Sequence, residues 1–242
     1  MSHDRLMRER LSHILQEVAK AEHAAGRHPD AVTVELAVKT QSVIDVAAAA
    51  SALEEMTGRR AVLGHNRVQE LLSMIENWPP GAPEVEWHYI GRLQSNKMGQ
   101  VLRTGALIET VDSAQTLTRL ENRLEASSQK YPIYMQVNTS GEDTKAGCDP
   151  REALALARQI YDSQYLDLCG LMTIGTNTEV TEDIAQSYRK LRELRDQISH
   201  DYPRRDGLEL ALSMGMTKDF TIAIAQGATI VRLGTGVFGP RA

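Results

Sequence analysis

Short apolar runs alternate with longer amphipathic segments along most of the chain. Residues 5–25 carry apolar side chains at helical spacing with charges between them, which predicts a lone helix that ends at Gly26. Residues 34–38 form an apolar, strand-like run, and Ser42 is a candidate N-cap for an alanine-rich helix that continues to about Met56. The chain therefore begins with an amphipathic helix and a first strand–helix unit.

The strand–helix pattern recurs until eight units have been counted. The further predicted strands are 61–63, 87–90, 107–111, 133–137, 166–174, 208–212 and 230–233. The predicted helices between them are 68–75, 95–102, 113–126, 150–161, 181–199 and 217–225, and a short tail follows the last strand. Parallel neighbours need crossover helices, so this α/β pattern favours a (β/α)8 TIM barrel with an extra N-terminal helix. A doubly wound parallel sheet is the alternative fold.

Length and composition narrow the organisation. The 242 residues fit one large domain or two small ones, and the longest Pro/Gly-rich connector, residues 78–83, only joins a helix to a strand. We therefore expect a single domain over residues 1–242. The 27 basic and 32 acidic residues give a net charge of −5 without blocks of like charge, so nucleic acid is not an expected partner.

Targeting and metal-binding signals are also missing from the sequence. No apolar run approaches the ~18 residues of a membrane span, and the charged N-terminal segment is unlike a signal peptide, so we expect a cytoplasmic protein that does not bind membranes. Cys148 and Cys169 are the two cysteines of the chain, and they lack metal-ligand spacing. Reduced structural thiols are expected, with neither a disulfide framework nor a metal site.

The residues that follow the strands should meet at the mouth of a TIM barrel, where its chemistry takes place. Ser213 and Gly215 follow the seventh predicted strand, and Gly234 and Thr235 follow the eighth. Loops at these positions of a TIM barrel often bind phosphate through backbone N–H groups. A tight turn would explain each glycine alone, but two such clusters on adjacent strands favour an anion site.

Lys39 directly follows the first apolar strand. Partial desolvation there favours the neutral amine that attacks an aldehyde, although a lysine extending into solvent is the alternative. An imine-forming lysine beside a phosphate site matches pyridoxal 5′-phosphate (PLP), which carries both an aldehyde and a phosphate. Arg232 would point inward by strand alternation, where its permanent charge would disfavour protonation of the pyridine nitrogen. The alternative for Arg232 is pairing with a core carboxylate.

Other polar residues near the predicted mouth are weaker candidates. His88 lies inside a predicted strand, where a histidine is more often a hydrogen-bonded core residue than a catalytic base. Lys97 opens a predicted helix, and Lys145 lies in the loop after the fifth strand. We expect Lys97 to face solvent.

Several motifs resemble those of the pyridoxal phosphate homeostasis proteins, whose fold is similar to the N-terminal barrel of bacterial alanine racemase. The resemblance covers nearly the whole chain and rests on LAVKT (36–40), GHNRVQE (64–70), WHYIGRLQSNK (87–97), GLMTIG (170–175), LSMGM (212–216) and VRLGTGVFG (231–239).

The resemblance implies a role for each of eight cofactor-binding residues. Lys39 carries the internal aldimine, Asn66 lies near the cofactor, and Arg232 faces the pyridine nitrogen. The remaining residues are Ser213 with the Gly234 and Thr235 amides, which hold the phosphate, and Met172 and Met214, which line the pocket. The chain departs from the family pattern at three positions: Val38 replaces the usual Ser, His65 replaces the usual Glu, and Arg67 is atypical.

By this resemblance the protein is a monomeric carrier that holds PLP as a lysine Schiff base, acts in vitamin B6 homeostasis and serves PLP-dependent apoenzymes. The alternatives are a weak amino-acid racemase or other PLP-dependent enzyme, and a barrel that binds a phosphate ligand without covalent chemistry. Racemase chemistry needs a second acid/base group, which alanine racemase draws from a C-terminal β domain. Three residues after Gly239 cannot build that domain, so we expect no robust catalysis.

Overall fold

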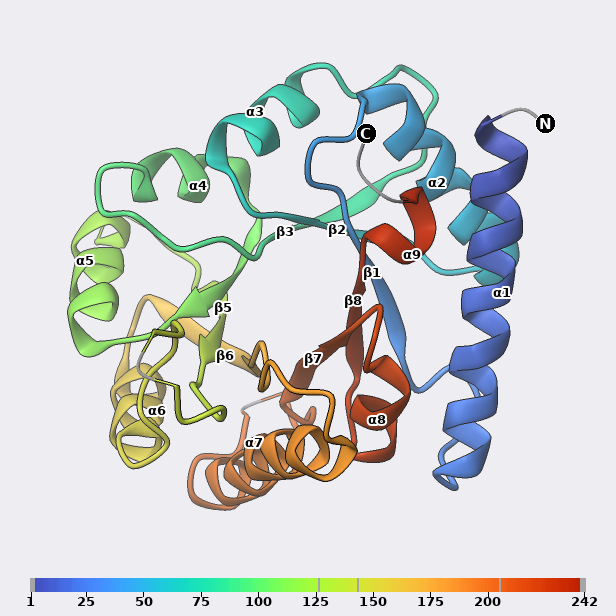
Figure 1. Cartoon of the computed structure of the whole chain (residues 1–242). Coiled ribbons are helices and arrows are strands. Elements are labelled where there is room, and N and C mark those ends of the chain that lie inside the picture. Colours follow the sequence, from blue (N-terminus) through green and yellow to red (C-terminus); the bar gives the residue numbers. More distant parts are fainter. Residues whose placement is uncertain (1–2, 126, 143, 205, 240–242) are drawn as a thin grey trace.

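Parallel strands close into a barrel in the computed structural model, which describes residues 3–125, 127–142, 144–204 and 206–239 (Figure 1). The strands in these residues are β1 (Thr33–Ala37), β2 (Ala61–His65), β3 (Val85–Tyr89), β4 (Leu107–Val111), β5 (Tyr131–Gln136), β6 (Leu166–Met172), β7 (Ala211–Met216) and β8 (Ile230–Leu233). Each strand pairs with the next in the chain, and β8 pairs with β1. The predicted TIM barrel is confirmed, and the doubly wound sheet is wrong.

Helices surround the barrel on its outside (Figure 1). They are α1 (His3–Ala24), α2 (Val43–Thr57), α3 (Val68–Glu76), α4 (Met98–Thr104), α5 (Ala114–Leu124), α6 (Ala153–Asp162), α7 (Thr181–Asp201), α8 (Phe220–Ala225) and α9 (Thr235–Phe238). The predicted N-cap of α2 is confirmed, because the Ser42 hydroxyl accepts a hydrogen bond from the Asp45 N–H at 3.1 Å. None of the helices in the described part of the chain is both long and apolar enough to cross a bilayer.

The N-terminal helix α1 lies outside the barrel and packs against α2, α8 and α9 (Figure 1). It therefore spans the seam between β1 and β8, where the first and last strands of the barrel meet. Its buried side chains Leu11, Ile14 and Val18 belong to the large core that separates the strands from the helices.

The interior of the barrel differs from this outer core. A small apolar cluster of Tyr134, Met172 and Ile230 lies inside the strands. Charged and polar side chains fill much of the remaining interior: Glu35, His88, Glu109, Ser213 and Arg232 are all buried. Burying a charged side chain costs free energy unless the charge is paired, so these side chains need hydrogen-bond or ion-pair partners inside the barrel.

Some predicted boundaries were wrong. Strand β7 begins at Ala211, not at Leu208, and β6 ends at Met172, not at Ile174. Helix α4 begins three residues later than predicted, and the predicted tail contains the single turn α9. The predicted end of the fifth helix, Ala126, lies outside the described residues.

Candidate functional site

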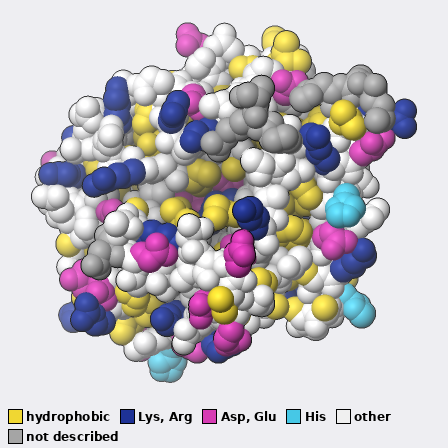
Figure 2. Space-filling view, in the orientation of Figure 1, with side chains coloured by type: hydrophobic (Ala, Val, Ile, Leu, Met, Phe, Trp, Pro, Cys, Tyr) yellow, Lys and Arg dark blue, Asp and Glu magenta, His cyan; other side chains and the backbone are white. Residues whose placement is uncertain are grey.

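A cavity of about 140 Å³ opens where β1, β2 and β8 end. It brings together several residues that the sequence singled out, and its lining includes Lys39, Gly64, Asn66, Gly234 and Thr235, together with Ala37, Gln41, Ile90 and Gly239. Figure 2 shows a hollow on one face of the barrel, with hydrophobic side chains at its bottom and Lys and Arg side chains around it.

Lys39 stands just beyond β1, and its side chain is half-buried. Within the described residues its amino group has no hydrogen bond or ion pair. The next residue, Thr40, adopts φ +61°, which is strained for a β-branched residue. Strain of this kind is concentrated at functional sites, and here it turns the chain directly after the lysine. The cavity therefore contains an uncommitted amine on a constrained backbone.

Two glycines, one lining the cavity and one behind Asn66, leave no room for a side chain. A Cβ at Gly64 would lie 1.9 Å from Glu35 Oε1, and a Cβ at Gly91 would lie 2.1 Å from the Asn66 carbonyl oxygen, so neither position has room for a side chain. The Asn66 Oδ1 atom is buried and has no hydrogen-bond partner in the described residues. A buried acceptor without a partner costs free energy, and a donor on a ligand in this cavity would satisfy it.

The phosphate end of the predicted site contains a residue that the sequence analysis did not single out. The Thr217 hydroxyl, in the loop after β7, accepts a hydrogen bond from the Gly236 N–H at 3.3 Å and lies 3.5 Å from the Thr235 hydroxyl. A Cβ at Gly234 would lie 3.0 Å from the Ala37 carbonyl oxygen, so the chain after β8 passes close to the end of β1. Backbone N–H groups beside two hydroxyls are suited to an anion.

Two predicted site residues lie elsewhere. Ser213 is fully buried in the barrel interior, where its hydroxyl donates to Glu109 Oε2 at 2.6 Å and accepts from Arg232 Nη1 at 2.7 Å. Met214 belongs to the outer core, because alternation turns it away from its inward-facing neighbour. Met214 is therefore not among the residues that line the cavity, whereas Met172 faces the barrel interior.

Arg232 points into the barrel, as alternation predicted, and has two fixed anchors. Its Nη1 atom donates to Ser213 Oγ, and its Nη2 atom donates to the Thr173 carbonyl oxygen at 2.7 Å. Glu109 continues this array, since its other oxygen lies 2.7 Å from His88 Nδ1. We call Arg232, Ser213, Glu109 and His88 the Arg232 chain. His88 is a hydrogen-bonded core histidine, which confirms that prediction.

Two buried glutamates sit side by side in different environments. Burial alone would raise the pKa of Glu109, but the hydrogen bond and charge of His88, with Arg232 and Ser213, hold that pKa below its ordinary value. Burial, followed by the charge of Glu109, raises the pKa of Glu35 well above its ordinary value. Neither oxygen of Glu35 has a hydrogen-bond partner in the described residues. The two neighbouring carboxyl groups therefore have pKa values shifted in opposite directions, and Glu109 is the one whose ionised form the surroundings stabilise.

The same glutamates and His88 place three potential metal-ligating atoms within 4.8 Å of one another. However, Glu109 is already engaged by His88 and Ser213, and the Arg232 cation lies on the same hydrogen-bonded array. We therefore interpret this cluster as a hydrogen-bonding array.

His65 is not among the residues that line the cavity. It is buried against Trp87, with ring centroids 5.8 Å apart, and both of its ring nitrogens lack partners in the described residues. Burial lowers its pKa to about 4, so it is neutral near pH 7.

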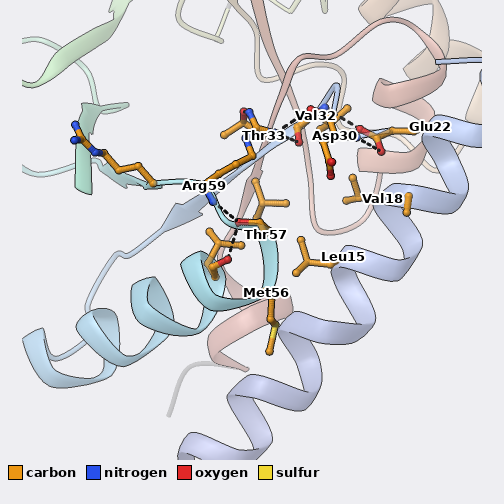
Figure 3. Close-up of a pocket in the computed structure, with 13 residues that line it drawn as sticks. Leu15, Val18, Glu22, Asp30, Val32, Thr33, Met56, Thr57 and Arg59 are labelled. Atoms are coloured by element: carbon orange, nitrogen blue, oxygen red, sulfur yellow. Dashed lines mark hydrogen bonds between the residues drawn. The ribbon is translucent and has the colours of Figure 1, made fainter. Parts of the chain in front are cut away.

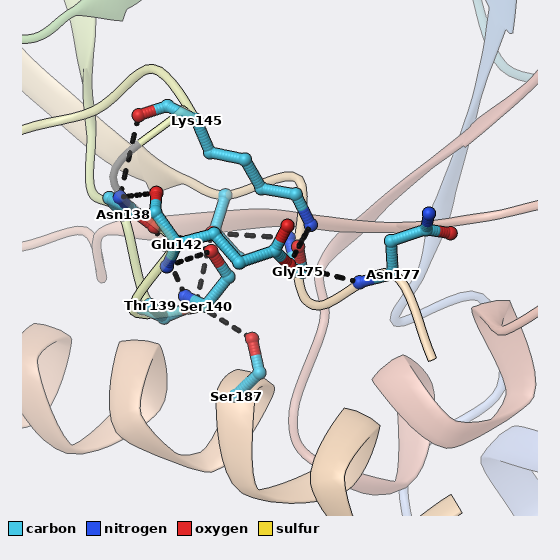
Figure 4. A network of polar contacts seen from close by, with 9 residues as sticks. Asn138, Thr139, Ser140, Glu142, Lys145, Gly175, Asn177 and Ser187 are labelled. Carbon is cyan, nitrogen blue, oxygen red and sulfur yellow. Dashed lines mark hydrogen bonds and ion pairs between the residues drawn. The ribbon is translucent and has the colours of Figure 1, made fainter. Parts of the chain in front are cut away.

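A second lysine near the mouth is already committed (Figure 4). Lys145 Nζ donates to the Gly175 carbonyl oxygen at 2.7 Å and pairs with Glu142 Oε1 at 2.8 Å. The same Glu142 oxygen accepts from the Asn177 N–H at 3.4 Å, so this pair joins the loop after β5 to the loop after β6. The Lys145 amine therefore has two partners, whereas the Lys39 amine has none in the described residues.

A different cavity, of about 220 Å³, lies between α1, α2 and the beginning of β1 (Figure 3). Its buried Glu22 accepts from the N–H groups of Asp30 and Val32. Arg59 donates to the Asp30 carbonyl oxygen and the Thr33 hydroxyl. These charged groups are satisfied by the protein itself, which indicates a structural role.

Comparison with known proteins agrees with this architecture. Residues 10–242 match the family "Alanine racemase, N-terminal domain". The chain is 36% identical over 234 residues to the pyridoxal phosphate homeostasis protein of Aquifex aeolicus, covering 96% of this chain and 97% of the relative. The structure of PipY from Synechococcus elongatus with PLP bound has a TM-score of 0.77 at 27% identity, covering 96% of this chain and 100% of PipY. An alanine racemase of Clostridium difficile, at 14% identity and a TM-score of 0.74, shares the fold.

Proposed function

The chain belongs to the pyridoxal phosphate homeostasis proteins, which share the alanine racemase N-terminal domain, and we propose that it is a PLP carrier that holds the cofactor on Lys39. The single observation that carries the assignment of Lys39 is that its amine, which has no partner in the described residues, lies in a cavity that is also lined by Gly234 and Thr235.

The residues of the cavity fit this cofactor. Lys39 Nζ would be the amine that bonds to the aldehyde of the cofactor, with the aldehyde oxygen released as water. The unpartnered Asn66 Oδ1 accepts a hydrogen bond from the bound molecule. The N–H groups of Gly234 and Thr235, with the Thr217 hydroxyl, hold the phosphate. When bound, PLP supplies a reactive aldehyde and an electron-accepting ring.

A carrier is favoured over a racemase because two acid/base candidates, His88 and Lys145, are already hydrogen-bonded or ion-paired within the protein. His88 is buried on Glu109, and Lys145 is bound to Gly175 and Glu142. Arg232 adds a permanent positive charge, which disfavours protonation of the ring nitrogen and weakens the ring as an electron sink. We propose that the protein releases PLP to apoenzymes and does not turn over amino acids.

Borohydride trapping tests the assignment. Reduction of the PLP-loaded protein should fix a phosphopyridoxyl group on Lys39, located by peptide mass spectrometry, and Lys39→Ala should abolish it. Lys97→Ala and Lys145→Ala are matched controls that should keep the adduct, because each removes another lysine near the mouth. An adduct mainly on Lys97 or Lys145 in the unmodified chain would show that the assignment is wrong.

Isotope exchange at the α-carbon of alanine separates carrier from enzyme. A general acid or base contributes roughly 10²- to 10⁴-fold in rate, so we expect exchange little faster than with free PLP. Turnover of about one per second, within the ordinary enzyme range, would contradict the carrier.

A further inference from the structure

The position of Ser213 along the barrel separates it from the phosphate cradle. In the β7–β8 register, Ser213 pairs with Ile230, which is four residues before Gly234. At about 3.3 Å per residue, Ser213 lies roughly 13 Å deeper along the strands than Gly234. A serine hydroxyl cannot span that separation, and Ser213 does not line the cavity that contains Lys39.

The hydroxyl of Ser213 is also fully used inside the barrel. It donates to Glu109 Oε2 and accepts from Arg232 Nη1, so it links a carboxylate on β4 to a guanidinium on β8. Arg232 has a long and mobile side chain, and a guanidinium held at Ser213 and at the Thr173 carbonyl keeps one orientation. The Arg232 chain therefore fixes both the direction and the charge environment of this arginine.

One of the two buried glutamates, Glu109, is placed to balance the positive charge of Arg232. Glu109 accepts from Ser213 and lies 2.7 Å from His88 Nδ1, which stabilises its ionised form. Glu35 lies 4.0 Å from the same His88 nitrogen and has no hydrogen-bond donor in the described residues, so burial keeps it neutral. Glu109 therefore supplies the negative charge opposite Arg232, and Glu35 does not.

We propose that Ser213 and Glu109 are positioning residues that hold Arg232 against the ring of the bound cofactor, and that Ser213 is not a phosphate ligand. This inference rests on the proposed function, since it assigns the ring to Arg232 and the phosphate to the loops after β7 and β8. It also replaces the expectation that the Ser213 hydroxyl binds phosphate.

Affinities for two ligands separate the alternatives. PLP and pyridoxal share the ring and the aldehyde, but pyridoxal lacks the phosphate. Ser213→Ala should weaken both ligands by the same factor, roughly three- to tenfold, because Arg232 loses one anchor and keeps its charge. Thr217→Val should weaken PLP about tenfold or more and leave pyridoxal nearly unchanged. A Ser213→Ala variant that weakens PLP alone would overturn the proposal.

Absorption spectra and double variants distinguish positioning from general damage. With Arg232 released, the ring nitrogen can take up a proton, so the visible band of the bound cofactor should become pH-dependent in Ser213→Ala and Glu109→Gln. Ser213→Ala should add no further spectral change to Arg232→Lys, because Ser213 acts through Arg232. Additive changes in the double variant would show that Ser213 does not act through the arginine.

Glu35→Gln is the matched control. It makes the same chemical change as Glu109→Gln, in the same buried layer, at a carboxyl that is already neutral, and should alter neither spectrum nor affinity. An equal effect of Glu35→Gln and Glu109→Gln on the spectrum and the affinity would refute the assignment of the negative charge to Glu109. If Glu109→Gln does not fold, comparison of the spectra of Ser213→Ala, Arg232→Lys and the double variant still tests whether Ser213 acts through Arg232. Failure of the unmodified protein to form any Lys39 adduct would instead refute the proposed function.

Discussion

Replacing Glu35 by Gln should change how stability depends on pH. Glu35 is fully buried, its pKa is raised well above the ordinary value of 4.5, and neither oxygen has a hydrogen-bond partner in the described residues. The folded protein therefore keeps a proton on Glu35 that the unfolded chain releases above pH 4.5. This contribution to stability is fully present below pH 4.5 and is lost as pH rises through the folded pKa. Gln cannot ionise, so the variant lacks this loss.

The size of this effect on the free energy of unfolding follows from the uptake of a single proton by Glu35. Between pH 4.5 and the folded pKa of Glu35, the free energy of unfolding of the unmodified protein should fall relative to that of Glu35→Gln. The slope is about 1.4 kcal/mol per pH unit for one proton. Above the folded pKa the difference between the two proteins should become constant. Groups common to both proteins cancel in this difference.

Urea unfolding of both apo proteins, monitored by circular dichroism at half-unit steps between pH 4 and 9, measures the difference. Glu109→Gln is the opposite control, because the pKa of Glu109 is held below its ordinary value and its contribution is complete above pH 4.5. Parallel curves for Glu35→Gln and the unmodified protein over the whole range would refute the claim that Glu35 is neutral in the fold.

Three further substitutions or reagents test other parts of the structure. His65→Leu should remove a loss of stability in acid of roughly 3 kcal/mol, because the unfolded histidine gains a proton below pH 6.5 and the folded one only near pH 4. The difference in urea midpoint between the variant and the unmodified protein should therefore change between pH 7 and pH 4.5, and a constant difference would contradict the prediction. Burial raises the pKa of Cys148 to about 12 and that of Cys169 to about 11. Neither thiol should therefore react with a thiol reagent at pH 8 until urea unfolds the chain. Rapid labelling of the native protein would contradict this prediction. Glu142→Ala should increase the acetylation rate of Lys145 several-fold in competitive labelling, whereas an equal rate would show that the ion pair does not protect the amine.

The sequence predicted the barrel well where strands are apolar and poorly where the barrel interior is polar. Strand β7 was placed too early because Leu208 continues the apolar pattern, although it is 66% exposed in the structure. The strand continues through Ser213 and Gly215 to Met216, where small and polar residues interrupt the hydrophobic run. Apolar periodicity carries no signal in a strand whose inward face hydrogen-bonds to charged groups.

The candidate site was predicted in part for a related reason. Lys39, Asn66, Gly234 and Thr235 do meet at one cavity, because all four lie at strand ends. Thr217, whose hydroxyl lies 3.5 Å from that of Thr235, was not predicted, although a hydroxyl just beyond a strand that ends Ser-Met-Gly-Met was a usable signal.

The two buried glutamates also had a signal that was not used. Glu35 and Glu109 each lie at the centre of a five-residue strand that is otherwise mostly apolar. Helices cover the outer face of such strands, so a central charge must point into the barrel. Which partners the charges find there depends on strand register across the barrel, and no local pattern specifies it.

Closure of the barrel between β1 and β8, with α1 packed across that seam, sets an order of events during synthesis. Lys39 leaves the ribosome about 200 residues before Thr235, which at about 5–20 residues per second is a delay of roughly 10–40 s. During that interval the nascent chain carries Lys39 without Gly234 and Thr235, to which we assign the phosphate. If the proposed function holds, selective loading of the cofactor is a post-translational event, and a ribosome-stalled chain that lacks β8 should show no preference for PLP over pyridoxal.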